Sequence, residues 1–121
     1  MILIYSTFPS LNSAKNVSEL LLEKKLIYCA NFWMHNSLYL GKTSENLDYN
    51  EKVLKEMEDG ENRIITSYEV GVIYKTSPEN WSELCGLFSE IHPYSTPILL
   101  KINVEDLNSE FGECLKNHGF K

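Results

Sequence analysis

A proline-rich turn places the strongest restriction on how this chain can fold. Residues 90–98 read Glu-Ile-His-Pro-Tyr-Ser-Thr-Pro-Ile and lie between a helical pattern and an apolar strand pattern. Because proline lacks an amide hydrogen and pushes the preceding residue toward an extended conformation, Pro93 is expected to end a helix at about Ile91 or His92. The second proline is expected to set the start of a strand. The turn should therefore be stiff and should hold His92 and Tyr94 in fixed directions, near whatever the protein recognises.

Composition limits the classes of protein to which the chain can belong. Its 121 residues suit a single domain spanning 1–121, and seven tyrosines, five phenylalanines and two tryptophans exclude a disordered chain. The net charge of −6 repels a phosphate backbone, so nucleic acid is not expected as a partner. No apolar run reaches the roughly 18 residues that cross a bilayer, and the first residues lack the basic region of a signal peptide. We therefore expect no membrane contact and a cytoplasmic location.

Neither the cysteines nor the histidines form a recognisable catalytic or metal-binding motif. Three widely spaced cysteines without a Cys-x-x-Cys pair predict buried, reduced thiols instead of disulfides or a zinc site. Of the three histidines, His118 is expected in a frayed tail, and His35 has no partner histidine at metal-ligand spacing. His92 alone has a rigid setting, as a metal ligand or as a helix-end residue. No nucleophile or phosphate-loop motif is present, so the chain is not predicted to be an enzyme.

Periodicity predicts four strands and three helices. The first strand, Ile2–Thr7, precedes a helix capped by Ser10, and a second helix begins at Ser77-Pro78, where a hydroxyl cap is followed by proline. The remaining elements are a long bent strand at 26–40, a strand from about 64 to 74, a strand at 98–104 and a short helix at 108–117.

This order predicts an α+β protein, a ferredoxin-like βαββαβ antiparallel sandwich with a short C-terminal helix. Two helices cover one face of such a sheet and leave the other bare. In this chain the bare face still carries aromatic and aliphatic residues, and large apolar surfaces are rarely left wet on a monomer. We therefore expect subunits to associate through the sheet.

Segment 42–62, between the second and third strands, does not belong to the minimal pattern. Seven acids against three lysines make it strongly acidic. Leu47, Leu54 and Met57 recur at helical spacing, which predicts a short helix on the surface. The insert is interpreted as a solvated excursion, with contact to an unknown protein partner as the alternative.

Several motifs in register resemble the CutA divalent-cation tolerance family, and the resemblance covers almost the whole chain. The histidine-proline-tyrosine turn is the most specific of them. The matching segments are 2–9 (Ile-Leu-Ile-Tyr-Ser-Thr-Phe-Pro), 26–31 (Leu-Ile-Tyr-Cys-Ala-Asn), 37–39 (Ser-Leu-Tyr), 68–70 (Tyr-Glu-Val), 73–76 (Ile-Tyr-Lys-Thr) and 92–97 (His-Pro-Tyr-Ser-Thr-Pro).

The resemblance implies a homotrimer built by strand pairing between subunits, with clefts at the interfaces and a role in tolerance of copper or other divalent metals. Copper ligands in some members correspond to Ser6, Ile91 and His92 here, so one donor of three remains. It also implies that Cys29, Glu69, Lys75, His92 and Tyr94 surround the intersubunit cleft.

Three functional hypotheses follow. The first is a non-enzymatic trimer that binds Cu²⁺ or another divalent cation weakly, with His92 as the metal ligand. The alternative is a trimeric signalling or interaction module resembling the PII class, which binds a small ligand or a protein partner, although no glycine-rich phosphate cradle is present. An enzyme with Cys29 or Lys75 as nucleophile is the third.

Overall fold

The computed structural model describes residues 1–42, 52–56 and 62–121. These parts of the chain form strands and helices. In order they are β1 (Ile2–Phe8), α1 (Leu11–Glu23), β2 (Cys29–Lys42), β3 (Lys52–Glu56), β4 (Asn62–Thr76), the 3-10 helix η1 (Pro78–Asn80), α2 (Trp81–Ile91), β5 (Leu100–Asn103) and α3 (Ser109–Asn117).

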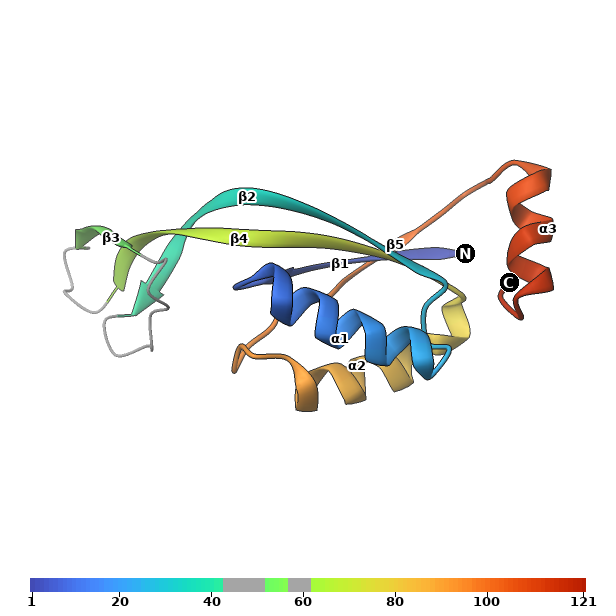
Figure 1. The fold of residues 1–121 in the computed structure, drawn as a ribbon. Coiled ribbons are helices and arrows are strands. Elements are labelled where there is room, and N and C mark those ends of the chain that lie inside the picture. The colour runs from blue at the N-terminus through green and yellow to red at the C-terminus, as the bar shows by residue number, and fades with distance from the viewer. Residues whose placement is uncertain (43–51, 57–61) are drawn as a thin grey trace.

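The sheet has the topology predicted from the order of elements. Strands β2, β4, β1 and β5 lie side by side in this order, and every neighbouring pair is antiparallel. Helices α1 and α2 both lie on one side of the sheet (Figure 1). The α+β, ferredoxin-like βαββαβ sandwich is thereby confirmed, with α3 as the short C-terminal helix.

The hydrophobic core lies between the sheet and the two helices. In β1 the alternation places Ile2 and Ile4 against the helices, while Leu3 and Tyr5 turn to the other side, called here the open face. Helix α1 starts where Ser10 was expected to cap it, because the Ser10 hydroxyl accepts the Ser13 N–H at 3.1 Å. Other core residues are Phe8, Ala14, Val17, Leu21, Val70, Val72, Tyr74, Leu84 and Phe88.

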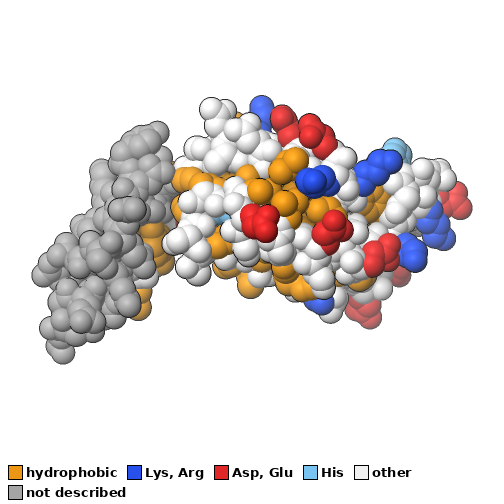
Figure 2. Space-filling model, turned by 90° about the horizontal axis from the view of Figure 1, so that it is seen from below, with side chains coloured by type: hydrophobic (Ala, Val, Ile, Leu, Met, Phe, Trp, Pro, Cys, Tyr) orange, Lys and Arg blue, Asp and Glu red, His pale blue; other side chains and the backbone are white. Residues whose placement is uncertain are grey.

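Strands β2 and β4 extend past the helices as a long arm (Figure 1). Tyr68 shares the helix-facing side of β4 with Val70, but it is 59% exposed because the helices do not reach that far. Met34, Leu38 and Leu40 on β2 are also exposed on this side of the arm. Figure 2 views the molecule from the helix side, and hydrophobic side chains reach the surface there beside the grey region.

The predicted helix in segment 42–62 is wrong where the structure describes that segment. Residues Lys52–Glu56 form β3, which pairs antiparallel with β4, Val53 opposite Ile65. A short helix is marginal in water, whereas a strand gains backbone hydrogen bonds along the edge of β4. Leu54 therefore belongs to a strand, and the other two residues of the proposed helical stripe lie outside the described residues.

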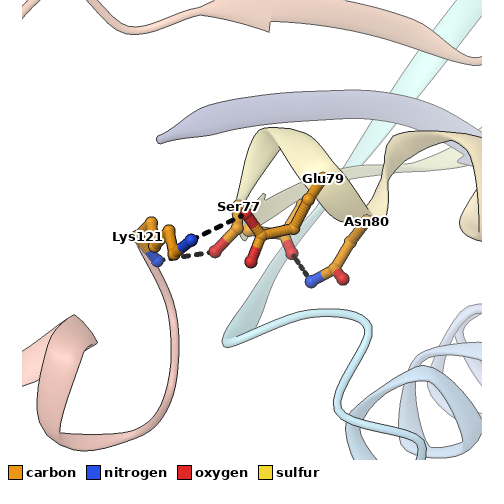
Figure 3. A network of polar contacts seen from close by, with 5 residues as sticks. Ser77, Glu79, Asn80 and Lys121 are labelled. Atoms are coloured by element: carbon orange, nitrogen blue, oxygen red, sulfur yellow. Dashed lines mark hydrogen bonds and ion pairs between the residues drawn. The ribbon is translucent and has the colours of Figure 1, made fainter.

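The C-terminal segment is docked onto the end of β4, so the frayed tail predicted for His118 is wrong. The Lys121 amide donates to the Ser77 hydroxyl at 2.6 Å, and the Lys121 ammonium lies 3.8 Å from Glu79 (Figure 3). The adjacent Phe120 is buried, and its amide donates to Leu115 at 2.8 Å. These contacts hold α3 beside the start of β2.

Apolar side chains occupy much of the open face in the single chain. Trp33, Leu100 and Ile102 are 38%, 49% and 44% exposed there. The Trp33 ring stacks on Tyr5 and covers Gly71, so closely that a β-carbon at Gly71 would overlap the indole. None of the helices in the described part of the chain combines the length and the apolar character needed to cross a bilayer.

Candidate functional site at the histidine-proline-tyrosine turn

The turn after α2 brings His92 against the end of β1. Helix α2 ends at Ile91, and His92 adopts an extended conformation with φ −72° and ψ 139°, as expected for a residue before proline. Its ring stacks on Phe8 with centroids 4.3 Å apart and packs against Phe88 at 4.8 Å. The helix end predicted from Pro93 is confirmed, and it places the imidazole inside the core.

Both ring nitrogens of His92 have hydrogen-bond partners. Nε2 lies 2.8 Å from the carbonyl oxygen of Thr7, to which it donates, and Nδ1 accepts the backbone N–H of Tyr94 at 2.9 Å. These partners define a neutral imidazole protonated on Nε2. Burial lowers the pKa of His92, although the Thr7 hydrogen bond and the Glu69 charge act in the opposite direction. His92 therefore fastens the turn to β1.

Tyr94 extends the same network to the open face. Its hydroxyl donates to the Glu69 carboxylate at 2.8 Å, and the Glu69 side chain is only 8% exposed. Glu69 lies opposite His35 of β2 in the strand register. Close by, His35 Nε2 and Ser67 Oγ are buried without a hydrogen-bond partner among the described residues. We call Glu69, His92 and Tyr94 the turn cluster.

Two of the residues expected beside this cluster lie elsewhere in the chain. Cys29 pairs with Lys75 across β2 and β4, and the Lys75 ammonium donates to the Asn31 side chain at 3.1 Å. Lys75 is six residues along β4 from Glu69, which corresponds to about 20 Å of strand. Within one chain the structure brings Glu69, His92 and Tyr94 together but holds Cys29 and Lys75 apart from them.

Comparisons with known proteins identify the family. A model of the CutA1 divalent ion tolerance protein family matches residues 60–118. The divalent-cation tolerance protein CutA of Thermococcus kodakarensis is 37% identical over 114 residues, 94% of this chain and 91% of that protein. CutA of Pyrococcus horikoshii is 34% identical over 111 residues, 92% of this chain and 90% of that protein. This chain belongs to the CutA divalent-cation tolerance family.

Solved CutA structures share the whole fold. A crystal structure of Pyrococcus horikoshii CutA, determined in the presence of guanidine hydrochloride, matches with a TM-score of 0.77 at 32% identity and covers 100% of both chains. CutA1 of Ehrlichia chaffeensis matches with a TM-score of 0.75 at 28% identity, over 96% of this chain and 92% of that one. The family description names metal-ion tolerance and no enzymatic activity.

The three positions at which the family resemblance led us to expect copper ligands do not form a copper site within the described part of the chain. Ser6 is fully buried and donates its hydroxyl hydrogen to the Ile98 carbonyl at 2.8 Å. Ile91 has no donor atom, and both nitrogens of His92 are already hydrogen-bonded. In the described ranges, no three His, Cys, Asp or Glu side chains are placed to hold a metal ion together. The residues present therefore do not fit the copper site expected from the resemblance.

A second polar cluster, which the sequence reasoning missed, lies where α3 meets the start of β2. The Cys114 sulfur is 3.2 Å from the Tyr28 hydroxyl and 3.9 Å from Nδ1 of His118. The signal that could have revealed it is the Cys-x-x-x-His spacing, which places two donors one helical turn apart. Cys29, Cys85 and Cys114 are free but only half-buried, so the prediction of buried thiols is wrong.

Proposed function

We propose that this CutA protein acts in divalent-cation tolerance as a homotrimer whose subunits join through the open face and the β2–β4 arm. The observation that carries the assembly is the exposure of apolar side chains on both surfaces, represented by Trp33, Leu38 and Leu100. Apolar patches larger than a few hundred Å² are rarely left wet on a monomer. Strand β5 lies at the edge of the sheet, where another chain can add hydrogen bonds.

Buried polar atoms on the open face support the same assembly. His35 Nε2 and Ser67 Oγ are shielded from water and have no partner within the described chain. Burying a polar atom without a hydrogen bond costs about 1–3 kcal/mol, so native proteins rarely retain such atoms. A partner subunit that supplies a donor and an acceptor removes this cost.

The proposed trimer also explains why the residues expected around the cleft fall into two separate groups within one chain. Glu69, His92 and Tyr94 lie together, and Cys29 and Lys75 lie about 20 Å along the strand. In the proposed assembly the turn cluster of one subunit faces the Cys29–Lys75 end of its neighbour. Each intersubunit cleft then contains a carboxylate from one chain and an ammonium and a thiol from the next.

Binding of Cu²⁺ or another divalent cation at this cleft is weak in our proposal. Glu69 supplies a carboxylate oxygen, but His92 can supply a nitrogen only if it loses its bond to Thr7 or to Tyr94. A cation must therefore compete with a hydrogen bond that fastens the turn. We assign no catalytic step to this cluster.

Solution mass tests the assembly. Light scattering or sedimentation at micromolar concentration should give three times the 14.0 kDa chain mass. Leu100→Lys on the open face should dissociate the trimer, whereas Leu11→Lys, a change of similar exposure on α1, should leave it intact. A 14 kDa particle from the unmodified protein rejects the proposed assembly.

Calorimetric titration with Cu²⁺ tests the cation role separately. We expect weak heats from the unmodified trimer and smaller heats from Glu69→Gln and His92→Ala, with circular dichroism as a check of folding. Equal heats from all three proteins remove the turn cluster from cation binding. That result leaves the assembly untouched, because the mass measurement is independent of it.

A further inference from the structure

The cluster between α3 and the start of β2 has no role in the proposed trimer cleft. The Tyr28 ring lies in edge-to-face contact with Phe111, His118 and Phe120, at centroid distances of 5.8, 5.3 and 5.8 Å. Its hydroxyl reaches the Cys114 sulfur. The docked C-terminus keeps these rings in place, because Lys121 is tied to Ser77 (Figure 3). Three heteroatom-bearing side chains thus meet on a well-packed support.

The spacing of sulfur and nitrogen in this cluster suits one shared metal ion. Cys114 and His118 are four residues apart on α3 and its C-terminal cap, so their side chains share one face. With metal–sulfur and metal–nitrogen bonds of about 2.3 and 2.0–2.1 Å, two donors lie roughly 3.6 Å apart at a tetrahedral angle and roughly 4.3 Å apart in a linear complex. The observed 3.9 Å between Sγ and Nδ1 falls between these values.

The donors select a soft cation. Thiolate and imidazole favour Cu(I) over the hard cations Mg²⁺ and Ca²⁺, which require oxygen ligands. Zinc in a structural site needs four protein ligands, and the described residues bring no third His, Cys, Asp or Glu to this place. Cu(I) accepts two donors, and the Tyr28 hydroxyl next to the sulfur offers an additional weak contact.

Solvent reaches the Tyr28 and His118 side of the cluster through an open cavity of about 790 Å³. Tyr28, Cys29, His118 and Phe120 line it, together with Leu22, Lys25, Ile27, Asn117 and Gly119. An ion can therefore approach the imidazole without unfolding of α3. Cys29 borders the same cavity but is not a ligand in the site proposed below.

We propose that Cys114 and His118 form a two-donor site for Cu(I), separate from the turn cluster. On binding, the Cys114 thiol loses its proton to solvent and the thiolate sulfur bonds to the metal. In the free protein, Nδ1 of His118 is 2.8 Å from the Cys114 carbonyl, to which it donates. That hydrogen bond is exchanged for the metal bond, and the imidazole proton moves to Nε2. The copper stays Cu(I) throughout, so no oxidant or reductant is consumed.

The test is an anaerobic titration of the full chain with Cu(I) held by a coloured chelator. We expect one Cu(I) per chain and at least about tenfold weaker binding by Cys114→Ser and by His118→Ala. Cys85→Ser, which removes a half-buried thiol from α2, is the matched control and should bind as the unmodified protein does. His92→Gln should also retain the site, which separates this proposal from the cation role of the turn cluster.

Thiol labelling supplies a second readout. Bound Cu(I) should protect Cys114 from alkylation, measured by peptide mass, while labelling of Cys85 is unchanged. Equal Cu(I) affinity in Cys114→Ser and the unmodified protein overturns the proposal, as does protection of Cys29 in place of Cys114. Circular dichroism of each variant distinguishes loss of the site from loss of the fold.

Discussion

The Tyr94 hydroxyl donates to the Glu69 carboxylate at 2.8 Å and thereby joins the turn after α2 to the open face of β4. Only 8% of the Glu69 side chain is exposed, so this hydrogen bond replaces water that the carboxylate has lost. The same tyrosine is fastened at its backbone by His92. The Tyr94 side chain therefore links the stiff turn after α2 to β4, the strand that continues into the arm.

Tyr94→Phe should lower the free energy of unfolding by about 1–3 kcal/mol, because it leaves a buried carboxylate oxygen without its donor. Urea denaturation measures the loss. Tyr68→Phe is the matched control, since Tyr68 is exposed on the arm, and it should change stability little. Equal effects of the two substitutions contradict the assigned role of the hydrogen bond.

The stability of the protein should fall as the pH drops below the ordinary histidine pKa of 6.5, partly because of His92. Burial lowers the pKa of this histidine in the folded chain. The unfolded chain therefore binds the proton first, and stability that is complete above pH 6.5 is lost as the pH falls through the folded value.

His92→Gln is the comparison for this pH dependence, because an amide can still donate to Thr7 but does not titrate. Denaturation midpoints are measured from about pH 7.5 down to about pH 5.5, a range that spans the ordinary histidine pKa. Over this range the midpoint should decline less steeply in the variant than in the unmodified protein. Parallel pH profiles of the two proteins would show that another group causes the decline.

Gly71→Ala should destabilise the sheet, since the added β-carbon overlaps the Trp33 indole. Overpacking of this kind costs about 1–3 kcal/mol. Thermal or urea unfolding of the variant measures the cost. A Trp33→Leu background removes the obstructing ring, so there the same glycine substitution should cost less, and an unchanged cost rules out the steric explanation.

Ser18→Ala should lower stability by about 1–3 kcal/mol through its effect on Tyr74. The two hydroxyls lie 3.0 Å apart in the core, and Tyr74 is fully buried. Adding Tyr74→Phe removes the unpaired hydroxyl and should restore much of the loss, as a double-mutant cycle in urea will measure. A strictly additive cycle is inconsistent with a direct hydrogen bond between the two side chains.

The fold was predictable because its periodic patterns are local and strong. The helical pattern before the proline turn and the position of Pro93 locate the end of α2 within a residue, and the strand pattern from about 64 to 74 locates β4. The strand at 52–56 was not predictable in the same way, because its pairing with β4 is a long-range contact that spacing within the segment does not encode.

The candidate site was predictable only in part, for a related reason. The two prolines of the turn marked His92 and Tyr94 as candidate site residues. Their hydrogen-bond partners, Thr7 and Glu69, lie on β1 and β4, and their positions follow from the register of the sheet. The same register separates Cys29 and Lys75 from the turn cluster. The contact of Tyr28 with Cys114 depends on the docking of α3, which no local pattern records.

Strands β1 and β3 both pair with the edge of β4 opposite β2, one beside the body of the domain and the other on the arm. Side chains alternate between the two faces along β4. One residue added between the part of β4 that pairs with β1 and the part that pairs with β3 would therefore move every side chain on the arm half of β4 to the opposite face of the sheet. Adding two residues to β2 and two to β4 would lengthen the arm and leave each side chain on its present face. Insertions in pairs therefore preserve the two faces of the arm, whereas a single inserted residue must be absorbed as a β-bulge, as between Val53 and Lys55 where β3 pairs with β4.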